Sequence, residues 1–62
     1  IHHLCFKVQD VVAKTNELKL KGYVLIHDQP VRGAKNCLVN FIHPKSTNGV
    51  LIEISEQMEA SK

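Results

Sequence analysis

The sequence has no tryptophan and only three aromatic residues, Phe6, Tyr23 and Phe41, among its 62 positions. A chain of this length forms one small domain, which buries only about 60% of the surface that its unfolded chain exposes. Because so few large side chains are available to enlarge the core, we expect a partner chain or a ligand to contribute to stability. The hydrophobic share of 44% and the charged share of 23% are typical of a globular domain, which excludes a disordered or fibrous chain.

Long apolar runs, basic clusters and paired cysteines are also lacking. No apolar stretch approaches the roughly 18 residues that a membrane span needs. The eight Lys and Arg are scattered and give a net charge of only +2, which argues against nucleic-acid binding. Cys5 and Cys37 are too isolated for a disulfide framework, so a reducing, cytoplasmic compartment is expected. The chain begins at Ile1 without a signal-peptide pattern, and we expect it to be a piece trimmed from a longer protein.

Hydrophobic periodicity predicts the order β-α-β-β-β. The expected elements are a strand over residues 2–8, a helix over 11–21 between an Asp10 N-cap and a Gly22 stop, and strands over 23–26, 37–43 and 50–55. The loop 31–36 is expected to use Gly33 and Asn36 at positive φ, and Asn48-Gly49 predicts a tight turn. Residues 1–55 are thus predicted to form a single α+β module, a mixed four-stranded sheet with one helix on one face, and residues 56–62 a polar C-terminal tail.

Strand parity indicates which side chains face away from the helix. Alternation over residues 2–8 places His3, Cys5 and Lys7 on the face that the helix does not cover, and the fourth strand places Glu53 on the same face. Imidazole and carboxylate groups are suitable ligands for a divalent metal, with Zn, Co, Ni or Mn as the candidates. Two ligands are too few for a site, so the others would come from another segment. By itself, such a pattern is more often an ordinary solvated strand face.

The residues also resemble a known family over nearly the whole chain. The matching stretches are residues 2–8 (HHLCFKV), 18–22 (LKLKG), 32–34 (RGA) and 40–53 (NFIHPKSTNGVLIE). They look like the C-terminal half of the methylmalonyl-CoA epimerases, which are part of the vicinal oxygen chelate (glyoxalase) superfamily. The resemblance implies two β-α-β-β-β modules paired into one cupped sheet that holds a divalent metal, with His3 and Glu53 as the two metal ligands that this half supplies.

The same resemblance implies a reaction, an epimerisation at the carbon α to a CoA thioester through a metal-stabilised enolate. Glu53 would then be one of two opposed catalytic bases, and the substrate would be an acyl-CoA or a similar small thioester. The other base lies in the N-terminal half of family members, so the site is complete only with a second module. That module is either the missing half or a second copy of the chain, and two copies would bring two His3 and two Glu53 to one metal in a homo-oligomer.

Two departures and two alternatives accompany this interpretation. The family favours an acidic residue where Lys7 stands and a glycine near Asn36, and the first change is expected to alter the electrostatics of the cup and the choice of substrate. A glyoxalase-type lactoylglutathione lyase would keep the site and change the substrate. A non-catalytic, antibiotic-sequestering member of the superfamily would instead hold a ligand in the cup without a metal.

Overall fold

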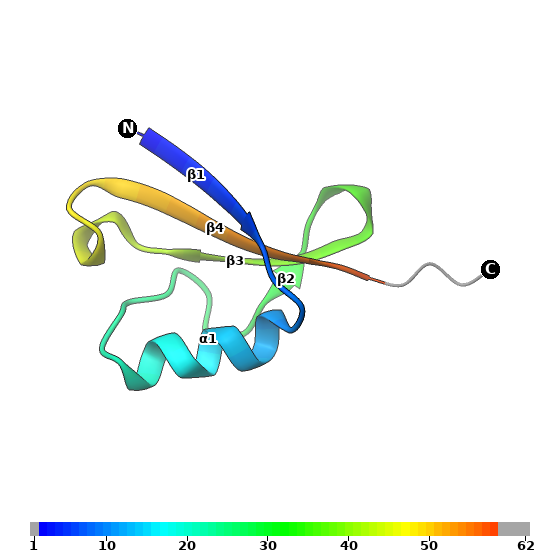
Figure 1. The fold of residues 1–62 in the computed structure, drawn as a ribbon, viewed down its shortest axis with the longest axis horizontal. Helices are drawn as coiled ribbons and strands as arrows, with labels where there is room; N and C mark the ends of the chain where they lie inside the picture. Colours follow the sequence, from blue (N-terminus) through cyan, green and yellow to red (C-terminus); the bar gives the residue numbers. More distant parts are fainter. Residues whose placement is uncertain (1, 59–62) are drawn as a thin grey trace.

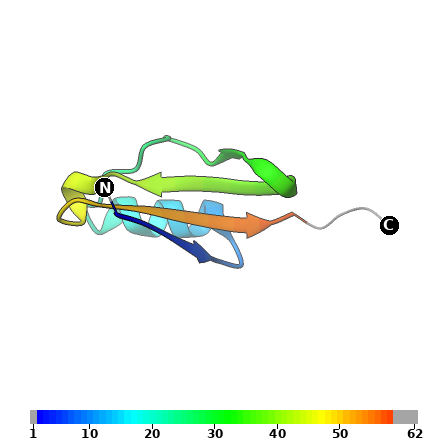
Figure 2. The same cartoon turned by 90° about the horizontal axis from the view of Figure 1, so that it is seen from above.

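The computed structural model of the protein describes residues 2–58. Its elements are β1 (His2–Lys7), α1 (Val11–Leu20), β2 (Val31–Arg32), β3 (Cys37–Ile42) and β4 (Val50–Gln57), with short 3₁₀ turns η1 (Ala34–Asn36) and η2 (Pro44–Ser46). The strand order is β1-β4-β3-β2, with β1 parallel to β4 and the other neighbours antiparallel. Figure 2 shows β4 between β1 and β3, with α1 behind the sheet. The predicted α+β class, one helix on a mixed four-stranded sheet, is confirmed (Figure 1).

The ends of α1 follow the capping signals in the sequence. Asp10 is the N-cap, and its Oδ1 accepts a hydrogen bond from the backbone N–H of Ala13 at 3.0 Å. At the other end Lys21 is the C-cap and Gly22 takes a φ of +93°, a conformation that glycine adopts at little cost. The helix ends one residue before the predicted Lys21. Within the described part of the chain, no helix is long and apolar enough to cross a membrane.

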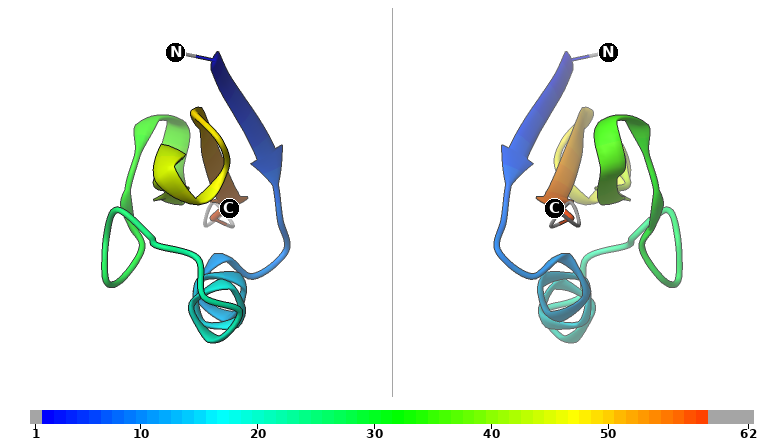
Figure 3. Two further views of the ribbon diagram at one scale, coloured as in Figure 1. Left: turned by 90° about the vertical axis from the view of Figure 1, so that its left-hand side faces the viewer. Right: turned by 90° about the vertical axis from the view of Figure 1, so that its right-hand side faces the viewer.

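The helix covers one face of the sheet and leaves part of that face bare. Val11 and Thr15 of α1 are buried against β3 and β4, where Ile42 and Ile54 complete the core. Figure 3 shows α1 on one side of the strands, with β1 at the edge of the sheet. Leu4 and Phe6 of β1 are 49% and 51% exposed, because α1 packs mainly over the other two strands. Apolar surface therefore remains beside the β1 edge.

The predicted second strand over residues 23–26 is wrong. The apolar run touches β3 through an isolated bridge between Leu25 and Ile42, and β2 lies instead at Val31–Arg32, in the segment predicted to be a loop. Regular strand pairing between residues 23–26 and β3 does not extend beyond this bridge in either direction. On one side the N–H of Tyr23 bonds to the helix at Leu18, and on the other the backbone of His27 bonds to a side chain.

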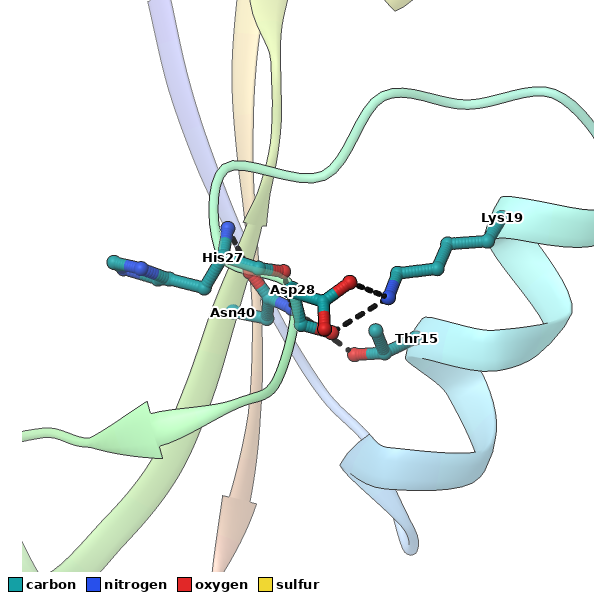
Figure 4. Close-up of polar contacts among 5 residues, drawn as sticks. All are labelled: Thr15, Lys19, His27, Asp28 and Asn40. Atoms are coloured by element: carbon teal, nitrogen blue, oxygen red, sulfur yellow. Dashed lines mark hydrogen bonds and ion pairs between the residues drawn. The ribbon is translucent and has the colours of Figure 1, made fainter.

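That side chain is Asn40 of β3, which is fully buried. Its Oδ1 accepts from the N–H of His27 at 3.1 Å, and its Nδ2 donates to the carbonyl of His27 at 3.0 Å and to Thr15 Oγ1 at 3.2 Å (Figure 4). The amide thus replaces a strand backbone as the partner of the 21–30 connection. Nearby, the Nζ of Lys19 bonds Asp28 Oδ1 at 2.8 Å, and this hydrogen bond holds the pKa of the Asp28 carboxyl below its ordinary value.

The start of the predicted tail belongs to the sheet. β4 runs through Gln57, so residues 56 and 57 continue the strand, while residues 59–62 of the predicted tail lie outside the described residues. Glu56 contacts the helix directly, because its Oε1 accepts from the N–H of Val11 at 3.0 Å. A carboxylate at this position satisfies one of the free N–H groups at the start of α1 and complements the positive end of the helix dipole.

Replacing Glu56 with Ala should therefore destabilise the domain by about 0.5–2 kcal/mol, the usual cost of a lost helix cap. Urea unfolding followed by circular dichroism measures the change. Glu56→Gln is the matched control, since its amide oxygen still accepts from Val11, and it should lose clearly less. Equal unfolding midpoints for Glu56→Ala and the unmodified protein would show that the contact does not stabilise α1.

Candidate functional site

The sheet face opposite α1, here called the open face, carries the polar side chains of the central strands. Cys5 of β1 and Phe41 of β3 both pair with Glu53 of β4, so these three residues form one row across the sheet. In the next row, Lys7 pairs with Ser55. Because cross-strand partners share a face, the strand register confirms the predicted side for Cys5, Lys7 and Glu53.

The structure brings the two predicted ligands into contact. Nε2 of His3 lies 3.2 Å from Oε1 of Glu53. His3 pairs with Leu51 in the parallel β1–β4 ladder, so Glu53 is two residues further along the neighbouring strand and on the same face. The side chain of His3 is 50% exposed and that of Glu53 is 22% exposed. Both groups are therefore accessible from the open face, and the carboxylate is the more enclosed of the two.

This pair fits half of a metal site. An imidazole nitrogen and a carboxylate oxygen that lie this close together can bind one divalent ion, and both are common ligands of Zn²⁺ and other transition metals. Within residues 2–58, however, no group of three or more His, Cys, Asp or Glu side chains could hold a metal ion. The donor chemistry is thus suitable, and the number of donors falls short of the four that a closed tetrahedral site requires.

A hollow of about 450 Å³ opens beside this pair, and we call it the cup hollow. Its lining includes apolar, charged and thiol side chains from three strands and one loop, chiefly Cys5, Lys7, Lys35, Val39, Phe41 and Glu53. Val39 is buried and Phe41 is partly buried, so the floor is apolar. A hollow with an apolar floor and polar groups around it is a common form of a small-molecule site.

One wall of the cup hollow is the loop between β2 and β3, which the sequence predicted only in part. Asn36 has the expected positive φ of 58°, whereas the second residue in this conformation is Lys35, with φ 57°, and not Gly33. Gly33 is needed for space, because a Cβ there would lie 3.1 Å from Cγ1 of Val39.

The end of β4 holds this loop in place. Nε2 of Gln57 donates to the carbonyl of Lys35 at 3.0 Å, and the N–H of Met58 donates to the carbonyl of Asn36 at 3.0 Å. Such backbone strain persists only when neighbouring contacts support it. Lys35 and Gln57 therefore belong to the site surroundings. Sequence patterns gave no signal for either residue, since both were assigned to irregular segments.

Comparison with known proteins shows a specific resemblance. No protein-family model matches the chain. The chain is 42% identical over 57 residues to the ethylmalonyl-CoA/methylmalonyl-CoA epimerase of Cereibacter sphaeroides, and 40% identical over 57 residues to the mitochondrial methylmalonyl-CoA epimerase of Dictyostelium discoideum. These matches cover 90% and 92% of this chain, which spans only 42% and 34% of the relatives' lengths.

Solved structures agree with these relatives. A hypothetical protein from Bacillus halodurans superposes with a TM-score of 0.88 at 39% identity, covering 100% of this chain and 45% of its own. The Streptomyces coelicolor methylmalonyl-CoA epimerase, in complex with 2-nitronate-propionyl-CoA, gives a TM-score of 0.88 at 34% identity and covers 94% of this chain and 41% of its own. The fold of the chain is thus that of one part of a longer protein in each case.

Proposed function

Because the chain has the fold of part of the methylmalonyl-CoA epimerases and resembles them over at least 90% of its length, we propose that it forms one module of an epimerase. The substrate is a CoA thioester, and the reaction inverts its α carbon. The observation that carries this proposal is the 3.2 Å contact between His3 and Glu53 on the open face, since it places an imidazole beside the carboxylate of Glu53, which lines the cup hollow.

The carboxylate of Glu53 has the chemistry to move the α-proton. When the C–H bond breaks, the proton passes to the carboxylate and the electron pair moves towards the thioester oxygen, which becomes negatively charged. His3 and Glu53 would hold a divalent ion, Co, Ni, Zn or Mn, which when bound supplies a Lewis acid for that oxygen. The partial enclosure of Glu53 limits access of water to the proton while it is held.

Inversion requires a second proton donor on the opposite side of the α carbon. Among the described residues, Glu53 is the only carboxylate that lines the cup hollow, so the donor would come from a second module. Among the described strands, β1 has a neighbour on one side only. Its other edge and the half-exposed Leu4 and Phe6 beside it offer that module both backbone hydrogen bonds and apolar surface. A second copy of this chain, or the remaining part of a longer protein, would complete the site.

Metal loading tests the shared site. Purified chain incubated with Co²⁺ or Ni²⁺ should have twice the monomer mass in solution and contain about one ion per two chains. His3→Ala should abolish ion retention, because the carboxylate of Glu53 alone is a weak ligand. His27→Gln serves as the control, because the backbone of His27 bonds to Asn40 and only His3 has a hydrogen bond to Glu53 among the described residues, and it should retain the ion. A metal-free monomer under these conditions would contradict the pairing of two copies.

A further inference from the structure

Two consecutive residues of the loop between β2 and β3 adopt the left-handed conformation. Lys35 has φ 57° and ψ 36°, and Asn36 has φ 58°. Asparagine tolerates this conformation because its short polar side chain bonds locally, and here Oδ1 of Asn36 accepts from Nη1 of Arg32 at 3.2 Å. A lysine has no such compensation. Lys35 is therefore the strained residue of the loop, and such strain persists where the surrounding contacts support it.

Gln57 supports this strained backbone with both ends of its side-chain amide. Nε2 donates to the carbonyl of Lys35 at 3.0 Å and to that of Asn36 at 3.4 Å. Oε1 accepts from Sγ of Cys37 at 3.6 Å, and Cys37 is the residue that pairs with Gln57 across β3 and β4. One exposed side chain at the end of β4 thus contacts three consecutive residues, at the point where the loop enters β3.

The loop that Gln57 holds closes one end of the cup hollow, and residues 33–36 are here called the loop wall. Gly33 lies against Val39, since a Cβ at Gly33 would be 3.1 Å from Cγ1 of Val39. Val39 is only 6% exposed. It pairs with Ser55, two residues along β4 from Glu53, which corresponds to about 6.6 Å. The loop wall therefore stands about the length of a short acyl group away from Glu53.

We propose that Gln57 is a positioning residue that keeps the loop wall against Val39 and thereby limits the length of the acyl side chain that the cup hollow accepts. This rests on the proposed function, in which the α carbon of a thioester lies beside Glu53. Gln57 acts on the substrate through the backbone of Lys35. Without the amide, the strained backbone relaxes, the loop wall moves away from Val39, and the hollow lengthens towards the end of β4.

The selectivity follows from the strain and its support. A longer acyl side chain fits only if it pushes the loop wall outwards, which breaks the contacts of Gln57 with the loop. One methylene in a closed apolar pocket changes kcat/KM by about 10–200-fold. We therefore expect the assembled protein to prefer methylmalonyl-CoA to ethylmalonyl-CoA, whose acyl groups differ by one methylene, and we expect this preference to depend on Gln57.

Epimerisation of these two thioesters by the complete assembled protein tests the selectivity. Gln57→Met has a side chain of similar length without the amide, and it should lower the ratio of the two kcat/KM values by about threefold or more. Gln57→Glu keeps the size and lacks the N–H donor, so it should shift the ratio in the same direction, also if Gln57→Met folds poorly. A general loss of stability would lower both rates alike and leave the ratio unchanged.

Gln9→Met is the matched control, because Gln9 is an exposed glutamine in the segment between β1 and α1. It should leave the ratio of the two kcat/KM values as it is in the unmodified protein.

Amide hydrogen exchange in the same variants reports the position of the loop wall without any substrate. The N–H of Gly33 donates to the carbonyl of Cys37 at 2.8 Å, and the N–H of Met58 donates to the carbonyl of Asn36 at 3.0 Å. Both amides are therefore protected only while the loop wall is in place. Both Gln57 variants should speed exchange at these two amides by about three- to tenfold, and Gln9→Met should not.

Four outcomes would overturn these assignments in different ways. Unchanged exchange in both Gln57 variants would show that Gln57 does not hold the loop wall. Faster exchange with an unchanged kcat/KM ratio would show that the loop wall does not limit the acyl group, and so would equal kcat/KM values for the two thioesters in the unmodified protein. If the unmodified protein turns over neither thioester, the proposed function itself fails, while the exchange rates still decide whether Gln57 holds the loop.

Discussion

Glu53→Gln in the assembled protein should lower turnover of methylmalonyl-CoA by about 10²-fold or more, while the protein remains folded. The amide cannot accept the α-proton, and general-base catalysis typically contributes 10²–10⁴-fold to a rate. The side chain of Glu53 makes one hydrogen bond to another described residue, to His3 at 3.2 Å, so the change should have little effect on stability. A coupled assay of epimerisation measures the rate, and thermal unfolding measures the fold.

Glu56→Gln is the matched control for this experiment. Glu56 lies on the same strand, three residues further along, and its side chain bonds to the helix on the other face of the sheet. Its amide variant should therefore keep nearly full activity. If Glu53→Gln turns over methylmalonyl-CoA within threefold of the unmodified protein, Glu53 is not the base.

The same variant separates the alternative functions. A protein that only sequesters a ligand needs no base, so Glu53→Gln would keep its affinity and there would be no turnover to lose. A glyoxalase-type enzyme would lose activity in the same way, and this would be seen with a glutathione hemithioacetal and not with methylmalonyl-CoA. Assays of both substrates with the unmodified protein therefore distinguish the two enzyme classes before the mutation is made.

The position of His3 and Glu53 could be predicted because it depends on strand parity alone. Residues two apart on a strand share a face whatever the exact pairing, and parallel β1 and β4 are neighbours in the sheet. The contact itself needed the register, which places Glu53 opposite Cys5 and hence diagonal to His3. Periodicity could not supply this register, since it is set by packing and hydrogen bonding between segments 50 residues apart in the sequence.

The features that the sequence did not predict depend on side chains that form hydrogen bonds with the backbone of distant segments. The apolar run 23–26 has the composition of a strand, and only the buried amide of Asn40 shows why the pairing stops at one bridge. The sequence predicts Glu56 to be a polar tail residue, whereas in the fold its carboxylate accepts a hydrogen bond from the N–H of Val11. The strained loop at Lys35 likewise depends on Gln57, 22 residues away. Local sequence patterns contain no information about such distant hydrogen bonds.

Asn40 is the residue whose replacement should most affect stability. Its side chain makes four hydrogen bonds, two as an acceptor from the N–H groups of His27 and Phe41 and two as a donor to the carbonyl of His27 and to Thr15. These bonds join the helix, the 21–30 connection and β3 at a position with no exposed surface. A leucine of similar size would leave several partners buried without hydrogen bonds, and each such group costs about 1–3 kcal/mol.

Asn40→Leu should therefore lower the free energy of unfolding by about 2–4 kcal/mol, a large fraction of the roughly 3–9 kcal/mol expected for a domain of this length. Thr15→Val is the graded control. It removes one of the four bonds, leaves Asn40 Nδ2 bonded to His27, and should cost about 1 kcal/mol. The unfolding free energy of the double variant should lie within a few tenths of a kcal/mol of that of Asn40→Leu, because both changes delete the same hydrogen bond. Urea unfolding provides all three values.

A cost below about 0.5 kcal/mol for Asn40→Leu would mean that the 21–30 connection is held by its apolar contacts and not by this amide.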